Sequence, residues 1–300
     1  MGSVDVTRVY EFEAVPGVFM QSEPTTDPTD FDNAAQNFGL IDRKYPTDQN
    51  TVAVVSKAWQ RFMRYVRYLE SSSGDAVTYK LLFLGRHGEG YHNVAEAYYG
   101  TKDWDDYWSK LDGNGTISWF DAHLTEVGVG QARAAGAFME AQMARDRMMP
   151  SPDSFYVSPM YRCLQTASFT WGDIPLPADK PFKPLIKELI REVLGEHTCD
   201  KRSTRSVIHK AFPDFPLEEG FSEQDKLWRA DHRETHQEHD ARNQILLDDI
   251  FSHDSNTILS LTSHSGAIAS MLRVLSHREF RLPTGGMIPV LVKATRISSA

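Results

Sequence analysis

The sequence predicts a three-layer α/β/α fold, in which helices cover both faces of a mostly parallel central sheet. The first observation is that short apolar segments of strand length recur along the chain, each ending at a polar break. The second is that segments with helical spacing of apolar residues lie between them, as the crossovers of parallel strands require. The predicted strands are residues 79–85, 154–158, 257–263 and 287–293.

The chain before the first of these strands is expected to be an arm and a helix packed on the core, spanning residues 1–75. Residues 15–50 are rich in Pro, Asp, Asn and Thr, which favour irregular structure. Residues 51–70 predict an amphipathic helix, because their apolar side chains have helical spacing. These side chains are Val55, Trp59, Phe62, Val66 and Leu69.

The main domain is expected to span residues 76–300. Its predicted helices are residues 124–147, capped by Thr125, and residues 159–170, 222–251 and 266–276. Acidic and aromatic segments at about 100–122 and 195–222 are expected to be insertions over one end of the sheet.

Composition restricts the partners and the compartment. The formal net charge is −9, so the chain lacks the basic balance that favours nucleic acid or an acidic membrane. The two cysteines, Cys163 and Cys199, do not have the spacing of a structural metal site. The first residues do not resemble a secretory signal, and no long apolar run predicts a membrane span. We therefore expect a cytoplasmic protein with a small-molecule ligand.

Charged side chains follow three of the predicted strands. Arg86 and His87 follow the first, Arg162 opens the helix after the second, and His264 and Ser265 follow the third. In a doubly wound sheet, ligands bind outside the carboxyl ends of the strands, where helix N-termini add partial positive charge. Two guanidinium groups and two imidazoles at this edge predict a pocket for a phosphoryl group.

These motifs resemble those of the histidine phosphatase superfamily, which has the phosphoglycerate mutase-like fold. The segment Arg86-His87-Gly88-Glu89, with Asn93 after it, resembles the RHG motif. SPMYRCLQTA (158–167) resembles the SPLxRxxQTA segment, and TSHSG (262–266) resembles the second-histidine motif. The resemblance covers about residues 78–293. The N-terminal arm and the WDDYWSKLDG and REVLGEHTCDKR segments are similar to fungal phosphomutase-like proteins.

The resemblance implies a two-step phosphoryl transfer without a metal ion or cofactor. His87 would attack phosphorus in its neutral form and become a phosphohistidine. Arginines and the second histidine would stabilise the negative charge on the nonbridging oxygens. The expected contacts with the phosphorylated substrate are Arg86, Glu89, Asn93, Arg162, His264 and Ser265.

A general acid must protonate the leaving group and later deprotonate water. Glu192 is the expected acid, because it lies between the second and third motifs. It lies three residues before Gly195, whereas the family often places the acid four residues before a glycine. Glu188 and Glu196 are therefore alternatives, since burial and nearby charge decide which carboxyl acts as acid.

Other residues allow two interpretations each. His232, His236 and His239 have the spacing of one helix face, and we interpret them as a solvated face rather than a metal site. The aromatic residues of the first insertion could cover the substrate or anchor the insertion to the core: Trp104, Tyr107, Trp108 and Trp119. Lys201 or Arg202 could bind a second anionic group or carry only surface charge.

The expected function is a phosphatase that hydrolyses a phosphomonoester, and a small organic diphosphate is not excluded. Gly90 stands where mutases of the family usually carry serine, which opens room near the nucleophile and weakens the case for a mutase. The alternatives are a phosphoglycerate-type mutase and a phospho-ligand binder without activity. The aromatic insertion favours a leaving group with apolar or ring character.

Overall fold

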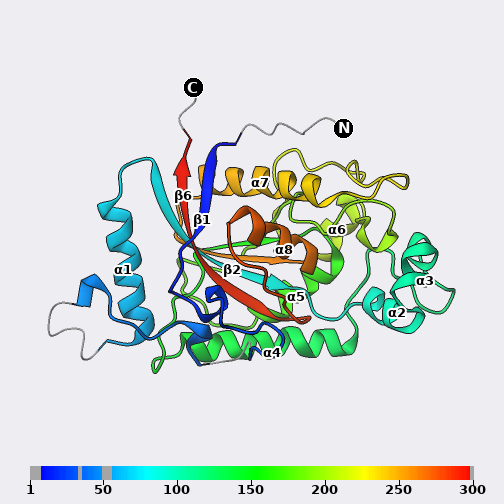
Figure 1. The fold of residues 1–300 in the computed structure, drawn as a ribbon. Helices are drawn as coiled ribbons and strands as arrows, with labels where there is room; N and C mark the ends of the chain where they lie inside the picture. The colour runs from blue at the N-terminus through cyan, green and yellow to red at the C-terminus, as the bar shows by residue number, and fades with distance from the viewer. Residues whose placement is uncertain (1–7, 33–35, 49–55, 298–300) are drawn as a thin grey trace.

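The computed structural model describes residues 8–32, 36–48 and 56–297, and a six-stranded sheet lies at its centre (Figure 1). The strands stand side by side in the order β1-β6-β2-β5-β3-β4. Their bounds are β1 Tyr10–Ala14, β2 Val77–Arg86, β3 Ser154–Val157, β4 Leu185–Ile186, β5 Ile258–Ser263 and β6 Met287–Arg296. The predicted α/β class is confirmed. The edge strands β1 and β4 were not predicted from the sequence, since one lies near the start of the arm and the other has two residues.

The sheet is mixed. β2, β5, β3 and β4 are parallel, as predicted, but β6 is antiparallel to both β2 and β1. The reason is the turn before β6, where Gly285 N donates to His87 O and Arg86 N donates to Gly286 O. The chain is thus fastened at the carboxyl end of β2 when β6 begins, so β6 runs back along β2. Gly285 has a φ of 74°, a left-handed conformation that glycine adopts without a steric penalty.

Helices cover both faces of this sheet, which confirms the three layers (Figure 1). The α-helices of the described residues are α1 Ala58–Ser72, α2 Tyr91–Tyr99, α3 Thr101–Asp106, α4 Glu126–Met143, α5 Tyr161–Trp171, α6 Arg205–Ala211, α7 His236–His253 and α8 Ser265–Val274. Helices α7 and α8 pack on one face, and α1, α4 and α5 contribute to the core of the other. Within the described ranges, no helix is long and apolar enough to cross a bilayer.

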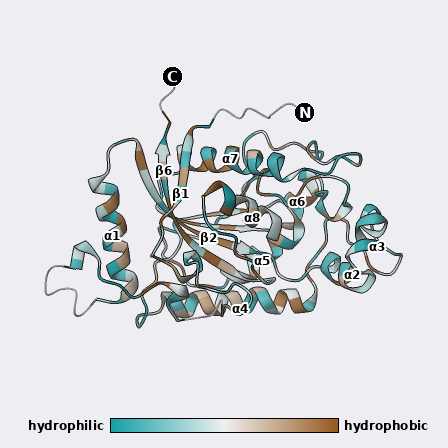
Figure 2. Ribbon diagram, viewed as in Figure 1, coloured by the Kyte–Doolittle hydropathy of each residue, from teal (hydrophilic) through white to brown (hydrophobic). Residues whose placement is uncertain are grey.

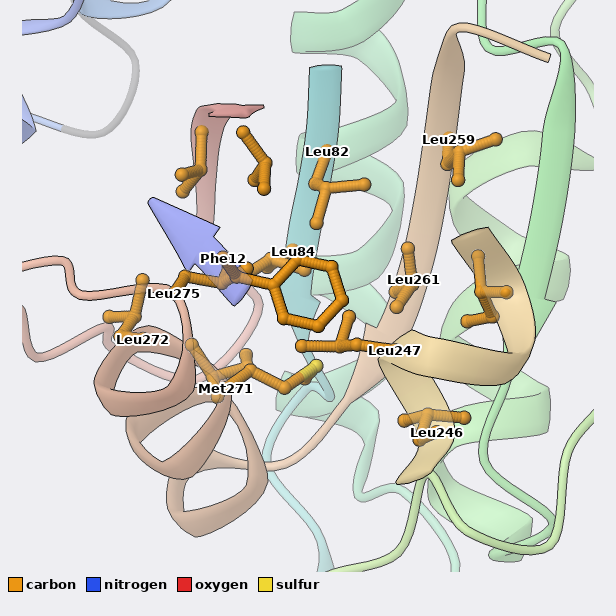
Figure 3. Packing of buried hydrophobic residues seen from close by; sticks show 14 of the residues in the cluster. Phe12, Leu82, Leu84, Leu246, Leu247, Leu259, Leu261, Met271, Leu272 and Leu275 are labelled. Atoms are coloured by element: carbon orange, nitrogen blue, oxygen red, sulfur yellow. The ribbon is translucent and has the colours of Figure 1, made fainter. Parts of the chain in front are cut away.

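The strand β2 shows why the core has two halves. Its side chains alternate between the faces, so Leu82 and Leu84 join the cluster beneath α7 and α8, while Leu81 and Phe83 join the opposite cluster. Figure 3 shows Leu84 near Leu247 of α7 and Met271 of α8, with Leu82 further along β2 in the same cluster. The central strands are accordingly among the most hydrophobic segments of the ribbon (Figure 2). A strand buried on both faces is a rigid support for the residues that follow it.

Two predicted helices have different bounds in the structure. The expected helix 51–70 begins at Ala58 and ends at Ser72, and Val55 lies outside the described residues. The expected helix 222–251 is wrong in its first half, because α7 begins only at His236. Thr235 caps α7 by accepting from Glu238 N, and the Glu238 carboxylate accepts in return from Thr235 N. This reciprocal pair fixes the start of the helix.

The interpretation of His232, His236 and His239 as a solvated face is wrong for His239. His232 and His236 are exposed, and His232 precedes the helix, but His239 is only 1% exposed. Burial first, and then the Arg242 guanidinium, lower the pKa of His239 to about 3. The imidazole is therefore neutral in the folded protein over the whole physiological range.

We expect the His239→Leu variant to lose less stability in acid than the wild type. Between pH 6.5 and 3 the unfolded chain binds a proton at His239 and the folded chain does not, so wild-type stability falls as pH falls through this window. The free energy of unfolding of the wild type should therefore fall, relative to that of His239→Leu, by about 1.4 kcal/mol for each pH unit below 6.5. Urea unfolding at pH 7, 6 and 5 measures this. The variant His236→Leu, which removes an exposed imidazole, is the control, and equal slopes for the wild type and His239→Leu would contradict the expectation.

Candidate active site

Three strand ends meet at one edge of the sheet, as the sequence predicts. The parallel register aligns Arg86 of β2 with Ser263 of β5, and Val157 of β3 with Thr262 of β5. The residues just beyond the strands are joined as well, because His87 N donates to Ser263 O. The β2, β3 and β5 ends, and the starts of α5 and α8, therefore form one site.

His87 is held in the form that a nucleophile needs. Its side chain is buried, and Nδ1 lies 2.7 Å from Gly88 O. A carbonyl oxygen only accepts, so Nδ1 carries the proton and Nε2 keeps its lone pair. Burial first, and then the Arg162 and Arg86 guanidinium groups, lower the pKa of His87 well below its ordinary value, against the contact with Gly88 O. The ring is neutral at pH 7.

The loop that carries His87 is fixed by α4 and α5. Gly88 N donates to Thr166 Oγ1 of α5 over 3.0 Å. A Cβ on Gly88 would lie 2.3 Å from Gly128 O, so only glycine permits this approach to the first turn of α4. Thr125 caps α4, as predicted, by accepting from Gly128 N.

Glu89 also helps to hold the loop after His87 against α4. One carboxylate oxygen accepts from Thr125 Oγ1 over 2.6 Å, and the backbone N of Glu89 donates to Gln131 Oε1. The structure therefore gives Glu89 a contact with the start of α4. Its expected contact with substrate stays a prediction.

His264 faces His87 from the start of α8. The two ring centroids are 5.1 Å apart, and His264 is fully buried. Its Nε2 lies 2.8 Å from Ser158 Oγ and 3.4 Å from Cys163 Sγ. Burial first, and then Arg162, lower the pKa of His264 well below its ordinary value, so this ring is neutral too.

Arg162 is anchored from behind. Its Nη1 donates to Cys199 O over 2.6 Å, and its Nη2 donates to Asp200 Oδ1 over 3.0 Å, while Nε is buried without a partner. Asp200 Oδ2 accepts from Arg233 over 2.9 Å. Burial alone would raise the pKa of Asp200, but Arg233 and Arg162 lower it below its ordinary value. Asp200 is thus an ionised carboxylate between two cations, and it fixes the direction of Arg162.

Arg86 directly precedes His87 in the chain. Its Nη1 donates to Leu282 O over 2.7 Å, and Nε is buried without a partner. It lines a pocket of about 310 Å³ together with Ser265, Gly266 and Phe280. A partly buried guanidinium that has an N–H without a partner among the described residues, and that lies beside an open pocket, can bind an anion.

Glu192 lies beside the N-terminus of α8. Its Oε2 accepts from Gly266 N over 3.0 Å, and Ser265 Oγ lies 3.4 Å away. A Cβ on Gly266 would lie 2.1 Å from Glu192 Oε1, so the glycine makes room for this carboxyl. Glu192 is therefore adjacent to the residues that follow His264, which suits the role predicted for it.

The two alternative carboxyls are placed differently. Both oxygens of Glu188 accept from Arg202 Nε over 2.9 Å, and one also accepts from Arg191. Both oxygens of Glu188 are thus occupied by guanidinium groups that hold this part of the chain together, which does not suit an acid that must reach a leaving group. The Glu196 side chain makes no hydrogen bond to the described residues. The geometry favours Glu192 over Glu188.

Asn93 belongs to the first turn of α2. Its Oδ1 accepts from Gly90 N over 3.0 Å, which leaves its amide nitrogen without a bond to the described residues. The amide is thus turned so that Nδ2 can donate elsewhere.

The structure also brings residues to the site that sequence reasoning missed. His92 follows in the same motif as His87, and its ring centroid is 5.3 Å from that of His87. The second imidazole in the KLLFLGRHGEGYHN stretch was a signal for it. Thr166 and Ser158 stood inside a motif already recognised, whereas nothing in the sequence pointed from Arg162 to Asp200, 38 positions away.

The aromatic residues of the first insertion anchor it. Trp104 and Trp119 are buried and share a small cluster with Cys199 of the second insertion. Trp108 stacks on Tyr99 of α2 with ring centroids 4.1 Å apart, while Tyr107 is exposed. The anchoring interpretation therefore holds for the tryptophans.

Arg202 is a structural residue. It is buried, is paired with Glu188, donates to the carbonyl oxygens of Ser222 and Gln224, and lies over the ring of Phe221. A second anionic group has no access to a guanidinium held in this way. Lys201 lies over the ring of Trp228.

One group of side chains among the described residues has the spacing of metal ligands, namely His197, Cys199 and Asp200. Both oxygens of Asp200 are taken by Arg162 and Arg233, and burial raises the pKa of the Cys199 thiol well above its ordinary value. The residues present do not fit a cation, because two arginines already occupy its place.

Comparisons with known proteins show the family to which the chain belongs. The model of the histidine phosphatase superfamily (branch 1) matches residues 108–286, a range that includes Arg162, Glu192 and His264. The chain is 52% identical over 294 residues to a "Probable phosphoglycerate mutase" of Arthroderma benhamiae. The matched region covers 98% of this chain and 87% of that protein. It is 40% identical to "Phosphomutase-like protein 3" of Candida albicans, over 71% of this chain and 65% of that protein. It is 41% identical to "Probable phosphoglycerate mutase PMU1" of Saccharomyces cerevisiae, over 72% of this chain and 79% of that protein.

Proposed function

Because the chain belongs to the histidine phosphatase superfamily, we propose that it hydrolyses a phosphomonoester, or a small organic diphosphate, through a phosphohistidine at His87. The observation that carries the proposal is the state of His87. The ring is buried and neutral. Its Nδ1–H donates a hydrogen bond to Gly88 O, and the lone pair of Nε2 is therefore available. Such a ring is ready to attack phosphorus.

In the first step, His87 Nε2 forms a bond to phosphorus, and the bond from phosphorus to the leaving oxygen breaks. The protonated carboxyl of Glu192 gives its proton to that oxygen. In the second step, water attacks the phosphohistidine, the Glu192 carboxylate takes a proton from the water, and the P–N bond breaks. The products are an alcohol and inorganic phosphate, and both residues return to their starting states.

Charge on the transferred group is stabilised by Arg86, Arg162 and His264, with Asn93 Nδ2 and Ser265 as further donors. The fixed direction of Arg162 supports this role, since donors held in place cost no reorganisation during the reaction.

The leaving group is proposed to lie in a second pocket, which has a volume of about 480 Å³. Tyr91, the residue after Gly90, is one of its lining residues. Ile117, Phe120 and His123 line it as well. His123 itself stacks on Tyr161, the residue before Arg162, with ring centroids 3.8 Å apart. The hydroxyl side chains of Thr116 and Ser118 complete the lining, so the pocket offers both rings and polar groups, and the rings support a leaving group with ring character.

A phosphoglycerate-type mutase is the second candidate, and the names of the fungal relatives favour it. A mutase must keep the free alcohol near the phosphohistidine and return the phosphoryl group to another hydroxyl. The space that Gly90 opens was one argument against this reaction. In the structure that space is filled by the ring of His92, since a Cβ at position 90 would lie 2.7 Å from His92 Nδ1.

Assays with p-nitrophenyl phosphate and with 3-phosphoglycerate separate the candidates. We expect net release of inorganic phosphate from the first, with no loss of rate when EDTA is added. Isomerisation of 3-phosphoglycerate without net phosphate release would identify a mutase and contradict hydrolysis. Absence of turnover and of an acid-labile phosphoenzyme would identify a binding protein. A panel of sugar phosphates, nucleotides and prenyl phosphates then defines the leaving group.

A further inference from the structure

A third imidazole lies against the nucleophile. His92 is the second residue of α2, and its ring centroid is 5.3 Å from that of His87, almost as close as the 5.1 Å to His264. Histidines therefore flank His87 from α2 and from α8. Only the one on α8 has a partner for its ring, in Ser158.

His92 has no hydrogen-bond partner among the described residues. Its side chain is 9% exposed, and Nδ1 is buried without a partner. The other ring nitrogen, Nε2, makes no hydrogen bond to the described residues either. This atom is not buried, so a ligand can reach it. Buried polar groups in native proteins are nearly always paired, so an unpaired ring beside the nucleophile indicates that a ligand completes its bonding.

The charge around His92 indicates the kind of ligand. Burial first, and then Arg162, His87 and Arg86, lower the pKa of His92 well below its ordinary value. A neutral imidazole has one N–H to donate. The site contains two arginines and three imidazoles, and no carboxylate of the described residues is hydrogen-bonded to these rings. Such a set of donors suits the binding of a phosphoryl group.

Resting on the proposed function, we propose that His92 donates a hydrogen bond to a nonbridging oxygen of the phosphoryl group that His87 attacks. His92 thereby contacts the group from α2, while His264 contacts it from the start of α8.

Gly90 is the residue that admits this ring. A Cβ at position 90 would lie 2.7 Å from Nδ1 and 2.8 Å from Cε1 of His92. The backbone of Gly90, with a φ of −107°, is one that any residue adopts. Glycine is therefore needed at position 90 because a larger residue would clash with His92, and not because of its backbone conformation. Gly90→Ala should act by displacing the His92 ring.

The first test is the His92→Phe variant, which keeps a ring but loses the N–H. Calorimetric titration with inorganic phosphate should show affinity lower by about tenfold to a hundredfold, the scale of a hydrogen bond to a charged group. The KM for p-nitrophenyl phosphate should rise in parallel. His92→Gln, which restores a donor, should recover part of the affinity. His236→Phe, on the exposed start of α7, is the matched control and should bind phosphate as the wild type does.

The second test is a double-mutant cycle between positions 90 and 92, which also covers the case in which His92→Phe does not fold. Gly90→Ala should weaken phosphate binding in the wild type, and should have no further effect in the His92→Ala background. Equal effects in both backgrounds, or a folded His92→Phe with unchanged phosphate affinity, would overturn the proposal. If the wild type forms a phosphohistidine while His92→Phe binds phosphate normally, only this inference fails. If His92-dependent phosphate binding is found in a protein without turnover, the proposed function fails instead.

Discussion

Replacement of His87 by alanine should abolish turnover while the protein stays folded. The nucleophile is lost, and neither His92 nor His264 can take its place without moving, since their ring centroids are 5.3 and 5.1 Å from that of His87. We expect kcat for p-nitrophenyl phosphate to fall by about 10⁴-fold or more, the scale on which loss of a nucleophile acts. The acid-labile phosphoenzyme should disappear at the same time. Stopped assays at high enzyme concentration, with acid quench and labelled substrate, measure both.

The control is His236→Ala, which removes an exposed imidazole and should leave kcat unchanged. Circular dichroism and urea unfolding check the fold of His87→Ala. No stabilising ion pair is removed with His87, because its ring is neutral and bonds only to Gly88 O. A folded His87→Ala protein with more than a hundredth of wild-type activity would remove His87 from the mechanism.

Replacement of Asp200 by asparagine should destabilise the protein more than any exposed charge change. Asp200 is 4% exposed and accepts from Arg162 and Arg233 through different oxygens. Asparagine keeps one acceptor and turns an NH₂ group toward the other guanidinium, so the buried Arg162 and the partly buried Arg233 lose their counter-charge. Removal of one partner from a buried pair costs about 3–5 kcal/mol. Urea unfolding at pH 7 should show a loss of this size.

The same substitution should reduce activity, because Asp200 fixes the direction of Arg162. The KM for p-nitrophenyl phosphate should rise in any fraction that stays folded. Asp231→Asn is the matched control, since Asp231 pairs with Arg229 at the surface, where both side chains are more than half exposed. That variant should unfold as the wild type does. Equal stabilities of the two variants would show that the buried pair adds nothing to the fold.

The sequence was informative where local pattern and local contacts coincide. Strands buried on both faces are rich in apolar residues, so β2 and β5 could be predicted from their short apolar segments. The chemistry at their ends could be predicted as well, because parallel strands in one sheet present their carboxyl ends at one edge. The register Arg86 to Ser263 then brings His87 and His264 together without further information.

The predictions failed where a long-range partner decides. The polar 222–235 segment has helical composition, but Asp225 pairs with Arg191 and holds it as a loop until Thr235 caps α7. His239 occurs in a polar sequence, yet it is buried. The direction of β6 followed from the bonds that fasten residues 285 and 286 to the end of β2.

The sequence by itself determined the fold class and the meeting of two arginines and two histidines at one edge of the sheet, because motif residues adjacent to strand ends need only the sheet to bring them together. Only the tertiary structure decided how these residues are held. It placed Asp200 behind Arg162, His92 against His87, and Glu192 at the start of α8. Such contacts join residues far apart in the chain, or depend on space such as that at Gly90, and no local pattern of side chains encodes them.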